Sequence, residues 1–428
     1  MKSVLIKSNQ KASGYARVYG AKNAILPIMA ASILSDEKSM IQNVPNLSDV
    51  SKMTEILSHL SVVTKNHDGK IMHINTKNIK YASIESGPVS QIRGSLFFLG
   101  SMIAKFKRAK IALPGGCNLN KSGRPVDLHI DGLLALGVDI KIENNTIVAN
   151  GGVKGGHYKF KKVSVGATEN LIMAATICDG VSTIENAARE PEVSDLIHYL
   201  NSKGAKIKGV GTSKIVIQGV KKLSDDNVPY KIICDRIAAI TYAMIIIATR
   251  GEGCVYCDDL MDIAEYEIEV LKKIGIKIDV DAKKMKIDAR DGIKNTIDIA
   301  TGPFFSGFAT DLQQQYVSLM STANGNLIVS ENIYDNRFMH VPYLNTMGAK
   351  IKINGNKAHI NGTGQLLEGG EFNLHERSLR ESAAMVIAGL SAKRDTILHE
   401  VTNIQRGYED FYNNMMHLGL KLERVNAC

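Results

Sequence analysis

The sequence contains no tryptophan and no apolar run long enough to cross a membrane. Its longest uncharged stretch covers residues 237–249, between Arg236 and Arg250, whereas a membrane-spanning helix needs about 20 apolar residues. This stretch therefore predicts a buried helix. Residues 1–10 hold two lysines and no apolar core, so they are not typical of a signal peptide. Together these features favour a cytoplasmic protein.

Cysteine is also scarce, with six residues in the chain. So few in so long a chain do not form the disulfide framework of a small secreted protein. Cys254 and Cys257 have CxxC spacing, but neither a second cysteine pair nor a histidine pair accompanies them. We therefore interpret them as core residues rather than zinc or redox ligands, and we expect no metal and no cofactor.

The excess of positive charge is moderate, with 52 Lys and Arg against 43 Asp and Glu, a net charge of +9. The lysines are scattered, and no aromatic-basic motif typical of RNA binding is present. The sequence thus gives no support to a nucleic-acid partner or to membrane insertion. We expect most of these lysines on solvated faces of helices and at strand ends, so binding of a small anionic substrate would depend on individual Arg and Lys side chains and not on the net charge.

A unit recurs six times: an amphipathic helix, an apolar residue followed closely by Gly, and two alternating strands. The glycines repeat about every 70 residues, a longer period than that of solenoids. In the first copy along the chain a serine replaces the glycine, so the positions are Ser61, Gly137, Gly204, Gly275, Gly348 and Gly419. In one copy, residues 191–200 carry an apolar helix face. We expect Gly204 to end that helix in the left-handed region and strands to follow at Ile207 and 215–217. Six such units in 428 residues predict an α/β protein with two groups of three.

The stretch at 113–129 is organised around a cysteine. Pro114, Gly115 and Gly116 break an apolar strand, so Cys117 is expected in a loop. Lys121 and Arg124 follow closely, and neighbouring cations lower the pKa of a thiol and favour the reactive thiolate. A buried structural cysteine is the alternative, and composition alone favours it.

Pro-Gly-Gly-Cys at 114–117, followed by Arg-Pro-Val-Asp-Leu-His at 124–129, resembles the UDP-N-acetylglucosamine enolpyruvyl transferases. Further matching motifs cover nearly the whole chain: Gly-Ala-Lys-Asn at 20–23, Val-Ser-Val-Gly-Ala-Thr at 163–168, Glu-Asn-Ala-Ala-Arg-Glu-Pro-Glu at 185–192, Thr-Asp-Leu-Gln at 310–313, Asn-Arg-Phe-Met-His-Val at 336–341 and Arg-Gly-Tyr-Glu at 406–409.

The resemblance implies a fold, namely a two-domain inside-out α/β barrel built from six βαβαββ-type units, with a cleft between the domains. One domain, residues 22–231, is inserted and carries a lid loop at about 113–125. The other comprises residues 1–21 and 232–428. We call the two points where the chain passes between the domains the crossing. Charged residues lie near it, and they either hold the two domains together or form ordinary surface ion pairs: Asp235 with Arg236, and Glu190 with Glu192.

The resemblance also implies a reaction: the enolpyruvyl group of phosphoenolpyruvate moves to the 3′-hydroxyl of UDP-N-acetylglucosamine, and phosphate is released. This is the first committed step of peptidoglycan precursor synthesis, and the loop cysteine is the fosfomycin target. The implied partners are the two substrates, and the implied catalytic residues are Lys22, Cys117, Asp311 and Arg406. Implied substrate contacts, some of them shared with the catalytic set, are Lys22, Asn23, Arg93, Arg124, Pro125, Val126, Asp127, Leu128, Lys162, Ser164, Val165, Gly166, Asp311, Ile333, Arg337, Arg380 and Arg406.

The implied roles follow the chemistry of the substrates. Lys22, Arg124 and Arg406 would bind the carboxylate and phosphate of phosphoenolpyruvate, with Arg380 as a further candidate. Cys117 would protonate the methylene carbon. Asp311 would contact the attacking hydroxyl as base or positioner, and its place before a helical segment also suits an N-cap.

Some positions depart from the family pattern. The interval from Cys117 to Arg124 is longer than usual, Phe97 stands where Trp is frequent, and Ser378 and Gln405 replace aspartates. Alternatives therefore stay open: a paralogue using another acceptor, such as another nucleotide or shikimate 3-phosphate, or a weakly active regulatory homologue. RNA phosphate cyclases, which act on RNA ends, share a related repeat fold. This sequence contains no adenylation motif, so it gives no support to that activity.

Overall fold

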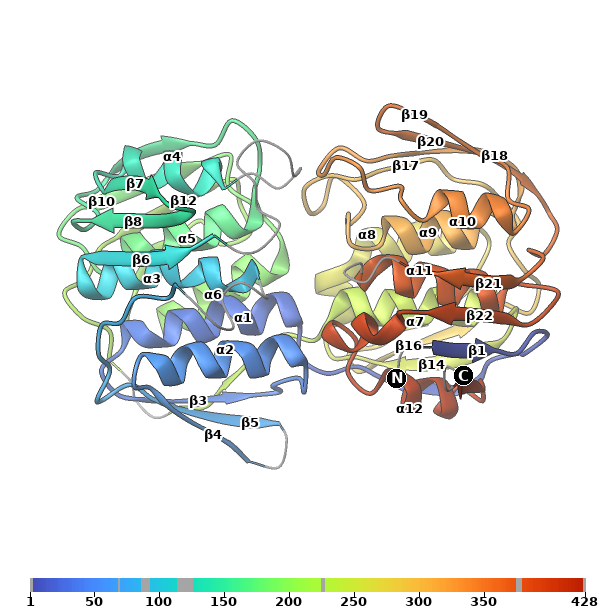
Figure 1. The fold of residues 1–428 in the computed structure, drawn as a ribbon, viewed down its shortest axis with the longest axis horizontal. Coiled ribbons are helices and arrows are strands. Elements are labelled where there is room, and N and C mark those ends of the chain that lie inside the picture. Colours follow the sequence, from blue (N-terminus) through green and yellow to red (C-terminus); the bar gives the residue numbers. More distant parts are fainter. Residues whose placement is uncertain are drawn as a thin grey trace. The chain divides into compact units, whose positions relative to one another are not determined.

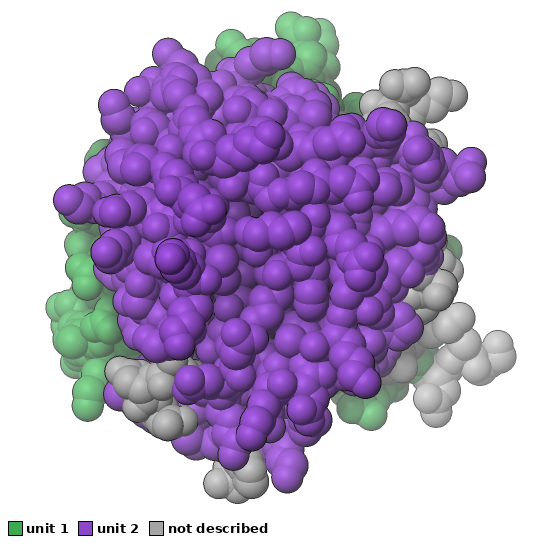
Figure 2. All heavy atoms as spheres, turned by 90° about the vertical axis from the view of Figure 1, so that its left-hand side faces the viewer, with its two compact units in different colours: residues 1–19, 234–428 green, residues 20–233 purple. Residues whose placement is uncertain are grey.

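The chain folds into two compact units in the computed structural model, which describes residues 3–67, 70–85, 93–113, 126–224, 228–374 and 379–425 (Figure 1). Unit 1 comprises residues 1–19 and 234–428, and unit 2 comprises residues 20–233 (Figure 2). The boundaries thus fall at 19/20 and 233/234, where the sequence analysis expected 21/22 and 231/232.

Unit 2 alternates helices and strands. Its helices are α1 (Lys22–Ala31), η1 (Ser32–Leu34), α2 (Ser48–His59), η3 (Arg93–Leu96), α3 (Phe97–Phe106), α4 (Asp127–Ala135), α5 (Val165–Thr176) and α6 (Pro191–Ser202). Its strands are β3 (Lys38–Gln42), β4 (Val63–His67), β5 (Ile71–Asn75), β6 (Arg108–Ala112), β7 (Asp139–Glu143), β8 (Thr146–Asn150), β9 (Gly156–Lys159), β10 (Val181–Glu185), β11 (Lys206–Lys208), β12 (Lys214–Gln218) and β13 (Tyr230–Lys231).

Unit 1 repeats the same order of elements. Its helices are α7 (Arg236–Ala248), α8 (Leu260–Lys273), α9 (Gln313–Met320), α10 (Val341–Thr346), α11 (Leu379–Leu390), η4 (Val401–Arg406) and α12 (Phe411–His417). Its strands are β1 (Ser3–Ile6), β2 (Ser13–Arg17), β14 (Glu252–Tyr256), β15 (Lys277–Val280), β16 (Lys284–Asp288), β17 (Ile299–Ala300), β18 (Asn324–Ser330), β19 (Ile351–Asn354), β20 (Lys357–Thr363), β21 (Gly370–Asn373), β22 (Thr396–His399) and β23 (Leu422–Val425).

The six-repeat prediction is confirmed by the sheets. One repeat runs β9-α5-β10-α6-β11-β12 and forms a sheet in the order β11-β12-β10-β9. Its β9–β10 pair is parallel, whereas the β10–β12 and β11–β12 pairs are antiparallel. Among the described residues, five sheets have four strands and one, β6-β8-β7, has three. In that sheet a parallel bridge between Ile84 and Ile111 stands where the others have a fourth strand.

The first helix of each repeat lies in the core of its unit. In unit 2, α3 contacts α1 and α5, and in unit 1, α7, α9 and α11 contact one another. Every residue of α7 is buried, which confirms the buried helix predicted near 237–249. Helices therefore form the interior and sheets the outside, because a helix that is apolar all round must be covered on every face.

The second helix of each repeat ends where the sequence places glycine. Gly204 has φ +91°, after α6 ends at Ser202, and strands follow at 206–208 and 214–218, as predicted. Gly137, Gly275, Gly348 and Gly419 also have positive φ. Ser61 adopts φ 63° at the matching point after α2, a conformation that costs a residue with a Cβ more than glycine.

The N-terminal segment completes two repeats of unit 1. Strand β1 lies between β22 and β23 in one sheet, and β2 pairs in parallel with β14 in another. Strand β13 likewise supplies the parallel partner of β3 in unit 2. Backbone hydrogen bonds join the chain ends of each unit, among them Asp235 N to Tyr19 O (2.9 Å) in unit 1 and Ala21 N to Ile233 O (2.8 Å) in unit 2.

The described residues contain neither a membrane-spanning helix nor a cluster of metal ligands. No helix in these ranges is long and apolar enough to span a bilayer. No three His, Cys, Asp or Glu side chains there are grouped so that they could hold a metal ion. Cys254 and Cys257 are free thiols, the first partly exposed on β14 and the second buried.

Candidate functional site

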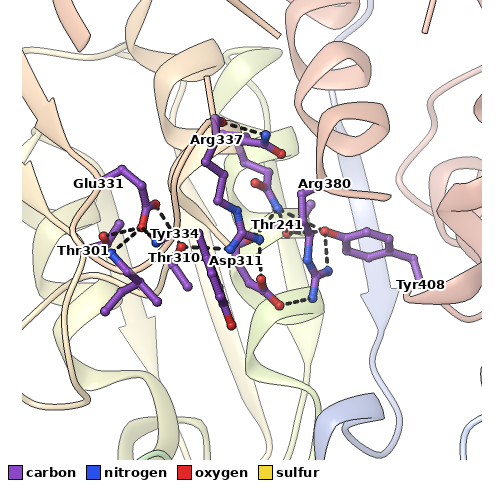
Figure 3. A network of polar contacts seen from close by, with 12 residues as sticks. Thr241, Thr301, Thr310, Asp311, Glu331, Tyr334, Arg337, Arg380 and Tyr408 are labelled. Atoms are coloured by element: carbon purple, nitrogen blue, oxygen red, sulfur yellow. Dashed lines mark hydrogen bonds and ion pairs between the residues drawn. The ribbon is translucent and has the colours of Figure 1, made fainter. Parts of the chain in front are cut away.

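Asp311 lies just before α9 and is held by two arginines (Figure 3). Its Oδ1 accepts from Arg337 Nη2 and its Oδ2 from Arg380 Nη2, both at 2.6 Å. The N-cap of α9 is Leu312, with no side-chain cap. The expectation that Asp311 caps this helix is therefore wrong, because the two guanidiniums take its oxygens instead.

The charges in this group reinforce one another. The side chains of Arg337 and Arg380 are 8% and 10% exposed, and that of Asp311 is 25% exposed. Burial alone would raise the pKa of Asp311, but Arg380 and Arg337 outweigh it and hold that pKa well below its usual range. Burial likewise opposes the charge of Arg380, yet Asp311 and Tyr408 raise its pKa. Asp311 and Arg380 are therefore ionised near neutral pH.

Tyr408 holds the second terminal nitrogen of the Arg380 guanidinium. This buried hydroxyl accepts from Arg380 Nη1 and from Gln315 Nε2, each at 3.1 Å. It lies 3.2 Å from Thr241 Oγ1, whose own proton goes to Ile237 O at 2.7 Å. Tyr408 therefore donates to Thr241, and α7, α9, α11 and the 406–409 motif meet at one hydroxyl. Arg406 ends η4 and is half-buried.

Glu331, which the sequence analysis did not single out, continues the network beyond Arg337 (Figure 3). Arg337 Nη1 donates to Thr310 Oγ1 at 2.9 Å, and Thr310 donates to Glu331 Oε2 at 2.8 Å. Glu331 Oε1 accepts from the backbone N–H groups of Ile333 and Tyr334. Its position two residues before Ile333, at the end of a strand, was the available signal.

Lys22 begins α1 in unit 2 and pairs with Asp49, at 2.9 Å between Nζ and Oδ2. Both side chains are largely buried, at 14% and 4% exposed. A cation in the first turn of a helix opposes the helix dipole, so Lys22 is not there to stabilise α1. Asp49, the first acidic residue of α2, supplies the countercharge and was missed from the sequence. Asn23 is half-buried beside Lys22.

The Ser-Val-Gly segment forms the N-terminus of α5. Ser164 is its N-cap, and its side chain accepts from Ala167 N at 3.4 Å. The N–H groups of Val165 and Gly166 lie in the first turn, where backbone donors and the helix dipole favour an anion. Lys162 is exposed just before this turn. This geometry suits an anion such as a phosphate group, and phosphate binding at this segment stays a prediction.

A buried histidine lies beneath that turn. A Cβ at Gly166 would lie 3.5 Å from His129 Cε1, and Phe97 packs alongside. His129 Nδ1 lies 2.7 Å from Asn170 Nδ2, which also donates to Leu96 O, while Asn170 Oδ1 accepts from Gly100 N. The histidine therefore accepts at Nδ1 and carries its proton on Nε2. Burial, and to a lesser extent the charge of Arg93, lower its pKa to about 3.

Three further predicted residues of unit 2 lie at the start of α4, and Arg93 lies on η3. Val126 is buried as the N-cap of α4, Asp127 is exposed in its first turn, and Leu128 is buried in the core. Arg93 is half-buried at the start of η3. Cys117, Lys121, Arg124, Pro125 and Ser378 lie outside the described residues.

The charged residues named near the crossing have contacts within their own units. Asp235 caps α7 by accepting from Ala238 N at 2.9 Å. Arg236 Nη1 lies 3.6 Å from Glu267 Oε1. Glu190 is the N-cap residue of α6, and Glu192 is buried in its first turn.

Known proteins resemble the chain over nearly its whole length. Residues 6–415 match the family described as EPSP synthase (3-phosphoshikimate 1-carboxyvinyltransferase). A UDP-N-acetylglucosamine 1-carboxyvinyltransferase of Rickettsia africae (strain ESF-5) is 40% identical over 436 residues, covering 99% of this chain and 100% of the relative. The protein of the same name from Rickettsia bellii (strain OSU 85-389) is 39% identical over 431 residues, with the same coverage.

Solved structures agree on the fold. The enolpyruvyl transferase NikO from Streptomyces tendae matches with a TM-score of 0.88 at 18% identity, over 100% of both chains. An EPSP synthase from Acinetobacter baumannii matches with a TM-score of 0.75 at 15% identity, over 99% of both chains.

Proposed function

Because this chain belongs to the enolpyruvyl (1-carboxyvinyl) transferase family, we propose that it transfers the enolpyruvyl group of phosphoenolpyruvate to the 3′-hydroxyl of UDP-N-acetylglucosamine and releases phosphate. The observation that carries the proposal is the identity of about 40%, over 99% of the chain, to relatives named for this reaction. The expected setting is peptidoglycan precursor synthesis in the cytoplasm, as part of cell-wall formation, cell shape and division.

Asp311 serves this reaction better as a positioner than as a base. A carboxylate whose pKa is held well below its usual range accepts a proton poorly. Each oxygen of Asp311 still has a lone pair beside the arginine contact, and that lone pair can orient the attacking 3′-hydroxyl. Arg380 contributes one N–H from each terminal nitrogen to Asp311 and Tyr408, which leaves its other N–H groups for substrate.

The anionic parts of the substrates fit the charged groups of the chain. Lys22, Arg124 and Arg406 are the proposed contacts to the carboxylate and phosphate of phosphoenolpyruvate. The α5 N-terminus, with Ser164, Val165 and Gly166, suits the diphosphate of the nucleotide. Asn23, Arg93, Pro125, Val126, Asp127, Leu128, Lys162, Ile333 and Arg337 complete the proposed nucleotide-sugar contacts.

One assay tests the function. Purified protein should release inorganic phosphate only when phosphoenolpyruvate and UDP-N-acetylglucosamine are both present, and mass spectrometry should show the enolpyruvyl group on the nucleotide sugar. Shikimate 3-phosphate and other UDP-sugars serve as matched acceptors. Turnover with one of these alone would replace the proposed acceptor, and no turnover with any would favour a regulatory homologue.

Cys117 is the proposed acid toward the methylene carbon, and it is tested separately. Fosfomycin, which places an anion beside an electrophilic carbon, should label Cys117 and stop turnover. Cys117→Asp should keep part of the activity, because a carboxylic acid can still donate a proton, and should resist the drug. Intact-mass measurement with peptide mapping decides this. An adduct on Cys254 or Cys428, or none in an active enzyme, would remove Cys117 from this role.

A further inference from the structure

We infer that Glu331 is a positioning residue for the transferase reaction: through Thr310 and the Ile333–Tyr334 backbone, it aims Arg337 at Asp311. The inference rests on the proposed function for its kinetic consequence. Its structural content, the aim of Arg337, can be tested without it.

The carboxylate of Glu331 accepts from four donors. Oε1 accepts from Thr301 Oγ1 (2.9 Å), Ile333 N (2.9 Å) and Tyr334 N (3.0 Å), and Oε2 accepts from Thr310 Oγ1 (2.8 Å). The residue is 3% exposed. An ionised carboxylate only accepts, with two lone pairs on each oxygen, so three donors share Oε1 and one reaches Oε2. A side chain that must itself donate would conflict with at least one of them.

Thr310 transmits this arrangement because its hydroxyl has one proton. That proton points to Glu331 Oε2, so a lone pair of the same oxygen faces Arg337 Nη1 at 2.9 Å. The guanidinium is planar and rigid, so fixing Nη1 also fixes Nη2, which contacts Asp311 Oδ1 at 2.6 Å. The hydroxyl therefore links the buried carboxylate to the orientation of the arginine.

The second route runs through the backbone. Glu331 Oε1 holds the N–H of Tyr334, and the guanidinium carbon of Arg337 lies 4.8 Å from the centre of the Tyr334 ring. The Arg337 carbonyl is held separately by Gln314 Nε2, at 2.9 Å. Glu331 thus fixes both the hydroxyl that Arg337 contacts and the ring against which it packs.

Thr310→Val tests the hydroxyl route without changing the charge. The isosteric side chain cannot accept from Arg337, and a small misplacement near reacting groups can reduce turnover about 100-fold. We expect that loss in kcat with little change in the KM for phosphoenolpyruvate. Thr310→Ser keeps the hydroxyl and should restore activity. Glu331→Gln should resemble Thr310→Val, and the double variant should lose no more than the worse single variant.

The control removes one hydrogen bond made by α9, the helix that follows Thr310 in the chain. Tyr316→Phe on α9 deletes the contact from the Tyr316 hydroxyl to Ile297 O (2.9 Å), so it should lower stability and leave kcat unchanged. If Thr310→Val kept kcat within about twofold of the wild type, or if Thr310→Ser lost as much as Thr310→Val, the inference would be overturned.

A crystal structure of Thr310→Val separates this inference from the proposed function. Arg337 should leave Asp311 in the variant and remain on it in Tyr316→Phe. An Arg337–Asp311 contact unchanged in Thr310→Val would overturn the inference whatever the wild-type assay shows. A displaced arginine would support it even if the wild type used another acceptor, in which case the failure belongs to the proposed function.

Discussion

Asp311 is the residue on which two guanidiniums depend for their countercharge. Asp311→Asn removes that charge and turns an amide N–H₂ toward at least one arginine. Loss of one partner of a buried ion pair costs about 3 kcal/mol or more, and turnover should fall by about 100-fold. Denaturant unfolding and steady-state kinetics measure the two effects. A variant as stable and as active as the wild type would contradict the arrangement.

The two buried histidines predict how stability depends on pH. Burial lowers the pKa of His340, and burial with the charge of Arg93 lowers that of His129, in each case to about 3 from 6.5. The unfolded chain therefore binds these protons first, and the free energy of unfolding falls as the pH drops from 6.5 toward 3. Each histidine contributes about 1.4 kcal/mol per pH unit in this window.

Substitution checks the assignment, because a neutral amide binds no proton. His340→Gln and His129→Gln should each remove one share of the pH dependence, whatever they do to stability at pH 7. Urea unfolding between pH 5 and 7 measures this slope. A slope that does not change in either variant would mean that the histidines titrate normally in the folded protein.

At the scale of single residues, the sequence motifs named the proposed site residues one by one but not their contacts. Asp311 and Arg380 are 69 residues apart, and only the packing of α9 against α11 brings them together. Asp49 and Glu331 belong to no motif that we recognised. Asp49 contacts Lys22 directly, and Glu331 reaches Arg337 through Thr310. Second partners of this kind have no spacing rule that a sequence displays.

Helix α2 is the element that lacks the glycine found after its five equivalents. Ser61 has φ 63°, a region in which a Cβ is disfavoured by about 1–2 kcal/mol. Ser61→Gly should raise the free energy of unfolding by about 0.5–1 kcal/mol, after the greater flexibility of unfolded glycine is subtracted. Thermal or urea unfolding of the variant measures the gain.

Gly204→Ser is the matched reverse change. A Cβ there would lie 3.5 Å from Ser224 Oγ, an ordinary contact, so its cost should be conformational and similar in size. Equal stability of Gly204→Ser and the wild type would show that the left-handed φ is not the cause of either effect.

The repeat of elements was visible in the sequence because each unit carries its own helix periodicity and glycine. The strand partners were not visible. β13 pairs with β3 from nearly 200 residues earlier, and the short sheet replaces a strand by the Ile84–Ile111 bridge. The N-cap role suggested for Asp311 was also mistaken, because the two arginines, and not the helix, determine where the Asp311 side chain points.

Unit 2 should be separable from unit 1 at the two boundaries between them, 19/20 and 233/234. Every sheet of unit 2 is made from strands of residues 20–233, and its ends meet through Ala21 and Ile233. A fragment of residues 20–233 should therefore unfold cooperatively by circular dichroism. A fragment of 20–224 lacks β13 and should be clearly less stable. Noncooperative melting of the longer fragment would contradict the independence of unit 2.

The position of β1 between β22 and β23 sets the order in which the protein can be completed on the ribosome. Residues 3–6 emerge about 20–80 s before their partners at 396–399 and 422–425 at usual synthesis rates. Unit 2 can finish folding in that interval, whereas the opening strand of unit 1 waits exposed. A nascent chain that stops short of its C-terminus therefore loses unit 1 and keeps unit 2, and the waiting strand is where chaperones would first be needed.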